Sequence, residues 1–170
     1  MLKKIAIALM LILPMGIAAQ TLKFGHVASQ EVLVLMPEYT KAMADMEALQ
    51  KKYTDELKIL TEDINKKFTE YQTAKNEGNL PQNIDERRQR EIQEMMERKD
   101  LFEQDAYTKM RETSTQLTNP ILQKLESAIK EVGAAEGVVY IFDLSSTHIP
   151  YVDDKQSTDL TQKVKTKLGL

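Results

Sequence analysis

The residues that could do chemistry are few and scattered in this chain of 170 residues. His26 and His148 are its two histidines, and it has no cysteine. His148 follows "SST", but a Ser-His pair needs an orienting carboxylate, and neither such an arrangement nor a nucleophile-elbow motif accompanies it. Metal-ligand spacings such as HExxH and CxxC do not occur in the sequence. Both histidines are therefore predicted to lie in strands and pack in a sheet, where they could form a weak pH-sensitive contact.

The remaining patterns do not indicate catalysis either. The segment "NEGN" lacks the spacing of a phosphate-binding loop. The many Asp and Glu pairs fall on helical segments, where nothing predicts the exclusion of water that acid–base catalysis requires. We expect no enzyme activity, no cofactor and no metal.

The first residues, "MLKKIAIALMLILPMGIAAQ", have the pattern of a secretory signal peptide. Lys3 and Lys4 precede the apolar run Ile5 to Leu13, which is too short to span a bilayer. Small residues then allow cleavage between Ala19 and Gln20. We expect a signal peptide at 1–19 and one mature domain at 20–170. Export without an anchor predicts a soluble protein of the periplasm, or a secreted one where the cell has a single membrane.

The charge of the chain argues against a nucleic-acid binder. The formal net charge is −3 and becomes −5 without Lys3 and Lys4, whereas binding to phosphates requires a basic surface. Because the chain has no cysteine, disulfides do not stabilise it after export.

Two long helices are predicted from the spacing of apolar residues. From Glu38 to Asn76 there is no Gly or Pro, and apolar residues recur at a mean spacing of 3.5 residues. "NEGNLPQN" at 76–83 interrupts this pattern, which resumes from Ile84 to Val132 at a mean spacing near 3.7 residues. The two helices should form an antiparallel hairpin, an arm at about 38–132 with its tip at 76–83.

The seam of this hairpin is imperfect. Arg88, Lys99 and Thr113 occupy seam positions, so we expect the distal arm to be loosely packed and flexible. Pro120 lies inside the second helix, where it removes a backbone hydrogen bond and should kink the helix.

Short strands at both ends of the chain predict a small sheet. One is expected within 21–28, in "TLKFGHV". "VVYIFDL", the turn "SSTH" and the return strand "IPYVD" suggest a hairpin within 137–153, followed by a helix at 157–168 capped by Ser157 or Asp159. A sheet of two or three short strands is not stable alone. We therefore expect further copies of the chain to complete it. The fold class is α+β.

The order of these segments resembles the Skp/OmpH family of periplasmic chaperones. The resemblance covers the mature chain and is most specific at "KFGHV", "FEQD", "IKEVGAAEGVVYIFD" and "DLTQKVKTKL". It implies a homotrimer whose strands build a small β-barrel body, and whose three arms surround a cavity that holds unfolded outer-membrane β-barrel proteins without nucleotide. One departure is the arm charge, since residues 38–119 contain 14 Lys/Arg and 18 Asp/Glu while arms of this family are often basic. Apolar contact should therefore matter more than bulk charge.

Three groups of candidate contact residues follow. The arm contains Met43, Met46, Met95, Met96 and Met110. Methionine suits surfaces that accept many sequences, and the favoured alternative is that these side chains fill the seam between the helices. Met43 and Met96 fall beside the seam and are therefore the better candidates for contact. The expected inner face of the arm consists of Tyr39, Met43, Met96 and Phe102. Contact with lipopolysaccharide or anionic lipid is one interpretation of Arg87, Arg88 and Arg90; a solvated helix face, with Glu86 and Glu91 offsetting the field, is the favoured one. The expected barrel and trimer contacts are Phe24, Val138, Val139, Ile141, Phe142, Ile149 and Val152.

Two functions of different classes fit the sequence. The first is an ATP-independent holdase for outer-membrane proteins. The second is a coiled-coil spacer or adaptor of the cell envelope that binds a folded partner at the arm tips. A spacer needs a continuous seam and stiff arms, so the interrupted seam, Pro120 and the methionines beside the seam favour the holdase.

Overall fold

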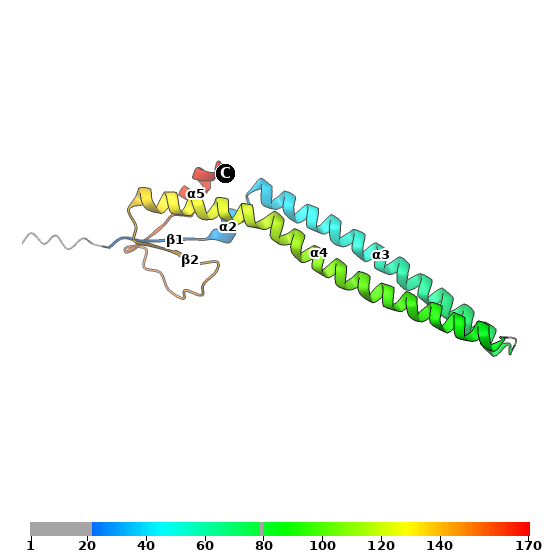
Figure 1. The fold of residues 1–170 in the computed structure, drawn as a ribbon. Helices are drawn as coiled ribbons and strands as arrows, with labels where there is room; N and C mark the ends of the chain where they lie inside the picture. The colour runs from blue at the N-terminus through cyan, green and yellow to red at the C-terminus, as the bar shows by residue number, and fades with distance from the viewer. Residues whose placement is uncertain (1–21, 79) are drawn as a thin grey trace, which may run out of the picture.

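The computed structural model describes residues 22–78 and 80–170, so the predicted signal peptide at 1–19 lies outside the described residues. A small body at one end of the molecule contains the strands and short helices, and two long helices run side by side away from it (Figure 1). This architecture confirms the α+β class and the helical arm. The elements are β1 (Phe24–Val27), α2 (Ser29–Leu33), α3 (Pro37–Asn76), α4 (Gln82–Glu136), β2 (Tyr140–Asp143), β3 (Ser157–Asp159) and α5 (Thr161–Leu168).

Helices α3 and α4 form the arm, and the predicted periodicity is visible in their burial. Every predicted seam position from Ile84 to Val132 in α4 is buried or half-buried. The same holds along α3 except at Phe68, which the spacing places in the seam but which is 46% exposed. Pro37 starts α3 at the position where a missing N–H costs nothing, and Gly78 turns the chain at the tip with φ of 70°.

The sheet differs from the predicted hairpin. β1 is the central strand, and β2 and β3 pair with its two sides, both in parallel. The prediction of a return strand at "IPYVD" is wrong: this segment lies in a loop, and the third strand is the polar segment Ser157–Asp159. A parallel partner for β1 depends on a neighbour distant in sequence, which local alternation cannot reveal.

The C-terminal helix is shorter than predicted. It begins at Thr161 rather than Ser157, and neither Ser157 nor Asp159 is its N-cap residue. The Asp159 carboxylate nevertheless accepts a hydrogen bond from the backbone N–H of Thr161 at 2.8 Å. The helix packs Leu160 and Val164 into the core, both with no exposed surface.

The core joins the body to the base of the arm. One cluster of buried residues combines β1, α2, the start of α3, the last third of α4 and α5; its members are Val27, Val32, Leu33, Met36, Ala42, Ile121, Leu125, Ala128, Val132, Leu160 and Val164. Gly25 permits the close approach of α5, because a Cβ there would lie 2.7 Å from Leu160 Cδ1. The arm is therefore rooted in the same core that supports the sheet.

Helix α4 changes direction where it leaves the body (Figure 1). Pro120 lies inside α4, close to where the buried base gives way to the arm. A proline that lacks an N–H and clashes with the preceding turn accounts for such a bend.

Candidate functional site

The arm offers the largest uncovered surface of the described chain, and its predicted contact residues fall into two groups. Met43 and Met96 are exposed by 37% and 53% of their surface. Tyr39 packs against the core cluster, and the rings of Phe102 and Tyr53 meet edge to face with centroids 5.8 Å apart. Tyr39 and Phe102 therefore support the hairpin, whereas the two methionines are free to contact another molecule.

Five further apolar side chains of the described arm are exposed and were not predicted as contacts. They are Ile59, Phe68, Leu101, Tyr107 and Leu122, exposed by between 46% and 72% of their surface. Four of them lie off the helical period, which is a signal available from sequence alone. Phe68 is the exception, because its spacing places it in the seam.

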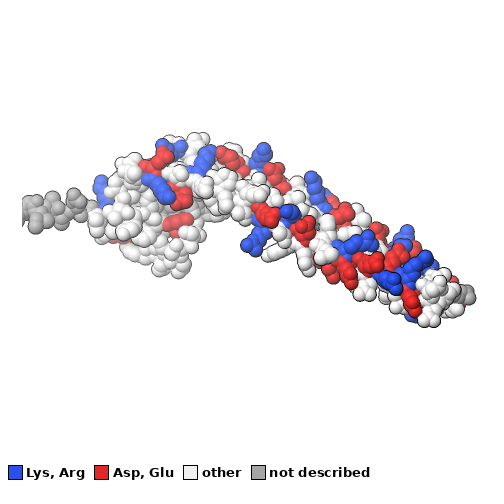
Figure 2. Space-filling model, in the orientation of Figure 1, with Lys and Arg blue, Asp and Glu red and all other residues white. Residues whose placement is uncertain are grey.

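Charged residues cover much of the arm and pair with one another. Lysine and arginine alternate with aspartate and glutamate along the face shown in Figure 2. Lys51–Asp55 and Lys109–Glu112 are examples within one helix, and Lys67–Glu91 joins α3 to α4 at 3.2 Å. Exposed ion pairs of this kind each contribute little to the free energy of folding. Because the lysines in them are already paired with carboxylates, they attract an acidic partner only weakly.

A polar cluster joins the two helices near the tip. The Tyr71 hydroxyl accepts hydrogen bonds from Lys75 at 2.8 Å and Gln89 at 2.7 Å, and Lys75 lies 3.7 Å from the Asp85 carboxylate. A hydrogen bond from Tyr71 lowers the pKa of Asp85 most, assisted by Gln89 and Lys75. Tyr71 and Ile92 are buried here. The two helices are thus joined at the end of the arm, and the looseness expected of the distal arm stays a prediction.

The predicted basic cluster stands beside this tip. Arg87 and Arg90 are exposed and Arg88 is half-buried. Arg87 and Arg88 line a hollow of about 170 Å³ together with Lys67, Glu70 and Glu91. The glutamates in the same hollow offset the cationic charge, as the favoured interpretation of a solvated face requires.

The outer face of the sheet carries aromatic side chains. Phe24 and Phe142 lie with ring centroids 6.4 Å apart, and Tyr140 lies 6.5 Å from Phe142. Tyr140 and Phe142 are 63% and 46% exposed. Among the other predicted contacts, Val139 is also exposed, Ile149 and Val152 are half-buried in the loop after β2, and Val138 and Ile141 pack against the chain's own core. Tyr140 was missed, although alternation along β2 places it on the same face as Phe142.

The two histidines have different environments. His26 lies in β1, is only 8% exposed, and its Nδ1 is 2.9 Å from the Ser157 hydroxyl of β3. His148 lies exposed in the loop after β2, so its prediction as a strand residue is wrong. Among the described residues no group of His, Asp and Glu could hold a metal ion.

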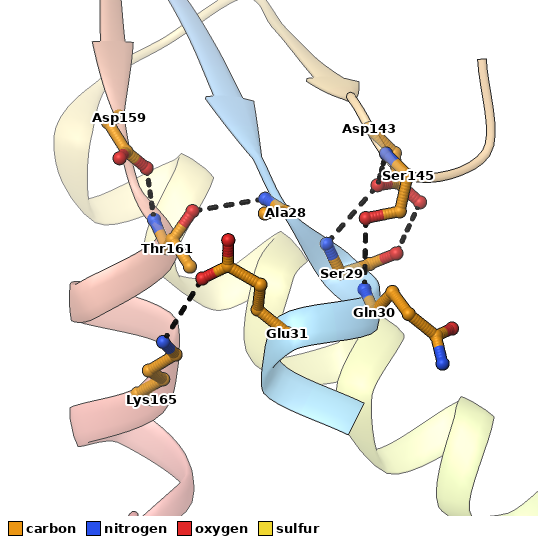
Figure 3. A network of polar contacts seen from close by, with 9 residues as sticks. All are labelled: Ala28, Ser29, Gln30, Glu31, Asp143, Ser145, Asp159, Thr161 and Lys165. Atoms are coloured by element: carbon orange, nitrogen blue, oxygen red, sulfur yellow. Dashed lines mark hydrogen bonds and ion pairs between the residues drawn. The ribbon is translucent and has the colours of Figure 1, made fainter. Parts of the chain in front are cut away.

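A hydrogen-bonded network fixes the start of α2 (Figure 3). The Asp143 carboxylate accepts hydrogen bonds from the Ser29 hydroxyl at 2.6 Å and the Ser29 N–H at 3.2 Å, and the Ser145 hydroxyl accepts one from the Gln30 N–H at 3.1 Å. On the other side, Thr161 accepts from the Ala28 N–H at 3.0 Å, and Lys165 pairs with Glu31 at 3.4 Å. β2 and α5 thus hold the segment that leads into the arm.

The geometry defines a class of protein before any comparison is made. A rigid base presents a long, exposed helical hairpin, and the described residues form no catalytic arrangement. No helix in residues 22–78 or 80–170 is long and apolar enough to cross a membrane. The class is that of a small body from which a long helical hairpin projects.

Comparison with known proteins gives the family. A family model described as Outer membrane protein (OmpH-like) matches residues 23–168, and the chain therefore belongs to the OmpH-like family. No curated protein matches the chain. The family is one of periplasmic chaperones and is not known for enzymes, so membership suggests a chaperone-type function that involves outer-membrane proteins.

Proposed function

We propose that this protein is an ATP-independent holdase of the periplasm. It binds unfolded outer-membrane β-barrel proteins between helical arms and prevents their aggregation before membrane insertion. The observation that carries the proposal is the arm itself, a hairpin of 40- and 55-residue helices on which Met43 and Met96 are exposed. Many weak, separated contacts suit a partner that must be held and then released without an energy source.

The proposal includes a homotrimer. Within the described chain, β2 and β3 each leave one edge without a partner strand, and the aromatic face of Phe24, Tyr140 and Phe142 is uncovered. Open edges and an exposed apolar face favour pairing with further copies. The number three comes from the resemblance to the family rather than from the edges.

A contact between Arg87, Arg88, Arg90 and lipopolysaccharide or anionic lipid is a subsidiary part of the proposal. The cluster lies at the end of the arm farthest from the body, where it could reach a membrane surface (Figure 1). Glu70 and Glu91 in the same hollow weaken its field, so the contact should be weak.

Light scattering tests the holdase activity. An outer-membrane β-barrel protein unfolded in urea is diluted into buffer without ATP, with and without this protein. We expect suppression of scattering that saturates near one trimer per unfolded chain. An unchanged signal at a several-fold excess of folded, oligomeric protein would contradict the proposal and favour the spacer that binds a folded partner at its tips.

A further inference from the structure

The two sides of the hairpin differ in charge. Two ion pairs between the helices lie on one side of the seam, Lys67 with Glu91 and Lys124 with Glu38, whereas a third, Lys75 with Asp85, lies on the other side near the tip. We name the side with the first two pairs the charged side. Each helical residue is rotated by about 100° from the one before it, so a step of one residue turns the chain by about 100° and a step of five residues by about 140°. Phe68 follows Lys67 by one residue, and Met43 and Met96 follow Glu38 and Glu91 by five. These three side chains therefore lie on the opposite side of the seam. We name that opposite side the neutral side.

Helix α3 shows the difference most clearly. The positions that flank its seam on the charged side are Glu38, Asp45, Glu56, Asp63 and Lys67. The corresponding positions on the neutral side are Met43, Gln50, Thr54, Thr61, Phe68, Gln72 and, near the tip, Lys75. Charges such as Glu47 and Lys58 occur farther out, on the surface that faces away from the seam. One flank of α3 therefore carries mainly charged residues, whereas Lys75 is the one charged residue among these positions of the other flank.

Helix α4 repeats the pattern with fewer uncharged positions. Its flank on the charged side carries Arg87, Glu91, Arg98, Asp105 and Lys109. Its flank on the neutral side carries Asp85, Gln89, Met96, Glu103, Tyr107 and Ser114. Both acids there have a lysine partner, Asp85 with Lys75 at 3.7 Å and Glu103 with Lys99 at 3.3 Å. The neutral side therefore has little unpaired charge.

Exposed apolar side chains occur at intervals along the neutral side. Met43 and Phe68 are 25 residues apart, which is close to seven helical turns and about 37 Å. Two contacts fix how α4 lies beside α3: Phe102 packs against Tyr53, and Glu91 pairs with Lys67. Because the helices are antiparallel, Tyr107 and Met96 of α4 lie alongside the part of α3 between Met43 and Phe68. The four side chains thus form a row along the arm at intervals of roughly 9–17 Å.

We propose that the neutral side is the surface that holds the unfolded chain, and that it selects uncharged and apolar segments through contacts that depend little on salt. The inference rests on the proposed holdase function and adds the chemistry of its partner. Apolar side chains supply hydrophobic contact, and the intervening amides and hydroxyls bond to the backbone of an extended segment. Charged segments gain nothing on this side.

An unfolded chain fits this surface better than a second copy of the arm. Stable protein interfaces bury roughly 800 Å² per partner around a continuous packed centre. Four side chains separated by polar residues do not form such a centre. An extended chain advances about 3.3 Å per residue, so it can place an apolar residue opposite each of the four in turn.

Affinity at two ionic strengths tests the chemistry. The probe is a fluorescently labelled outer-membrane β-barrel protein, unfolded in urea and diluted into the intact oligomer. We expect its affinity to change by less than about two-fold between conditions in which the Debye length is about 30 Å and about 3 Å. A loss of affinity of ten-fold or more at high salt would overturn the proposal while leaving the holdase function intact. Absence of binding by the unmodified protein would instead contradict the holdase function itself.

Matched double variants test the surface. Met96→Glu/Tyr107→Glu changes the neutral side, where the side chains are 53% and 72% exposed. Ile59→Glu/Leu101→Glu is the control, with 51% and 64% exposure. Ile59 and Leu101 follow Glu56 and Arg98 by three residues, which places them outward on the charged side. We expect the first pair to weaken binding about ten-fold and the control to leave it within about two-fold, since ten-fold corresponds to about 1.4 kcal/mol of lost apolar contact.

Two further measurements keep the test decisive. Met96→Gln/Tyr107→Gln removes apolar surface without adding charge, and it should show a smaller loss in the same direction. Circular dichroism and the native mass of each variant report folding and assembly. Equal losses for the two glutamate pairs would overturn the proposal. A change of oligomeric mass confined to the neutral-side variants would also overturn it, because it would identify the neutral side as a contact between copies.

Discussion

At the scale of single residues, the contacts of Asp143 determine how the arm is attached to the body. Its carboxylate accepts hydrogen bonds from Ser29 and from the Ser145 N–H, and so stabilises the start of α2 in the way that a capping residue does. Burial raises the pKa of Asp143, but the hydrogen bonds from Ser29 and Ser145 lower it more, and the net shift is downward.

We predict that this contact gives stability that depends on pH. A carboxyl group whose pKa is lower in the folded state stabilises that state above its ordinary value near 3.8, and this contribution is lost as the pH falls through the lowered value. Asp143→Asn should therefore reduce the free energy of unfolding by about 1–2 kcal/mol at neutral pH. Urea unfolding at constant protein concentration should show the two proteins converging as the pH falls below 3.8. A constant difference across that range would contradict the prediction.

Tyr71 is the corresponding residue at the tip. Tyr71→Phe removes the hydroxyl that Lys75 and Gln89 share but keeps the buried ring. We predict that amide exchange in the last turn of α3 and the first turns of α4 becomes roughly five-fold faster, as expected for one lost hydrogen bond of about 1 kcal/mol. Tyr107→Phe is the control, because that side chain is 72% exposed and should change nothing there. Faster exchange in both variants would argue against a specific role of Tyr71.

At the scale of elements, the helices could be predicted from sequence better than the strands. Every seam position that the spacing predicts from Ile84 to Val132 in α4 is buried or half-buried. This works because the apolar period of a packed helix is a property of its own sequence. No comparable pattern in the local sequence predicts β3. "STD" is short, polar and unlike a strand, and its pairing with β1 joins residues 133 positions apart in sequence, such as Ser157 opposite Phe24. The same spacing places Tyr39 and Phe102 in the seam, and both are half-buried, so their prediction as contact residues went against the helical period.

Close packing between β1 and α5 yields a prediction for Gly25. A Cβ at Gly25 would lie 2.7 Å from Cδ1 and 3.3 Å from Cγ of Leu160, and because Leu160 is fully buried its side chain can move aside only by repacking the core. Gly25→Ala should destabilise the body by about 1–3 kcal/mol, as overpacked cores do. Thermal unfolding measures this. The control is Gly137→Ser, which has nothing within 4 Å but carries the strain of a positive φ, so it should report that strain without a clash. A Gly25 variant as stable as the unmodified protein would contradict the packing.

The bend in α4 yields a prediction for Pro120. Pro120→Ala restores the N–H that the helix lacks at this point, so α4 should straighten and gain up to about 3 kcal/mol of stability. Small-angle X-ray scattering of the assembly should report a changed maximum dimension. An unchanged scattering profile would show that packing at the base of the arm, rather than the proline, sets the bend.

At the scale of the whole molecule, the body and the arm present different kinds of surface. The body has open strand edges and an aromatic face, while the arm is closed at its tip by Tyr71 and rooted at its base in the core. The middle of the arm contains few fully buried residues, such as Ala106 in α4. An assembly of such chains would present several arms around a common space, in keeping with the chaperone family to which the chain belongs.

The native mass of the complex tests this central claim most directly. The protein is mixed with an excess of an unfolded outer-membrane β-barrel protein without ATP, and the complex is weighed by native mass spectrometry. We predict three copies of this chain with one unfolded chain, and loss of the complex in Tyr140→Ser/Phe142→Ser, which removes the aromatic face of the sheet. A folded single chain that binds the unfolded protein one to one, or an assembled protein that binds none, would contradict the claim that arms around a shared space hold the unfolded chain.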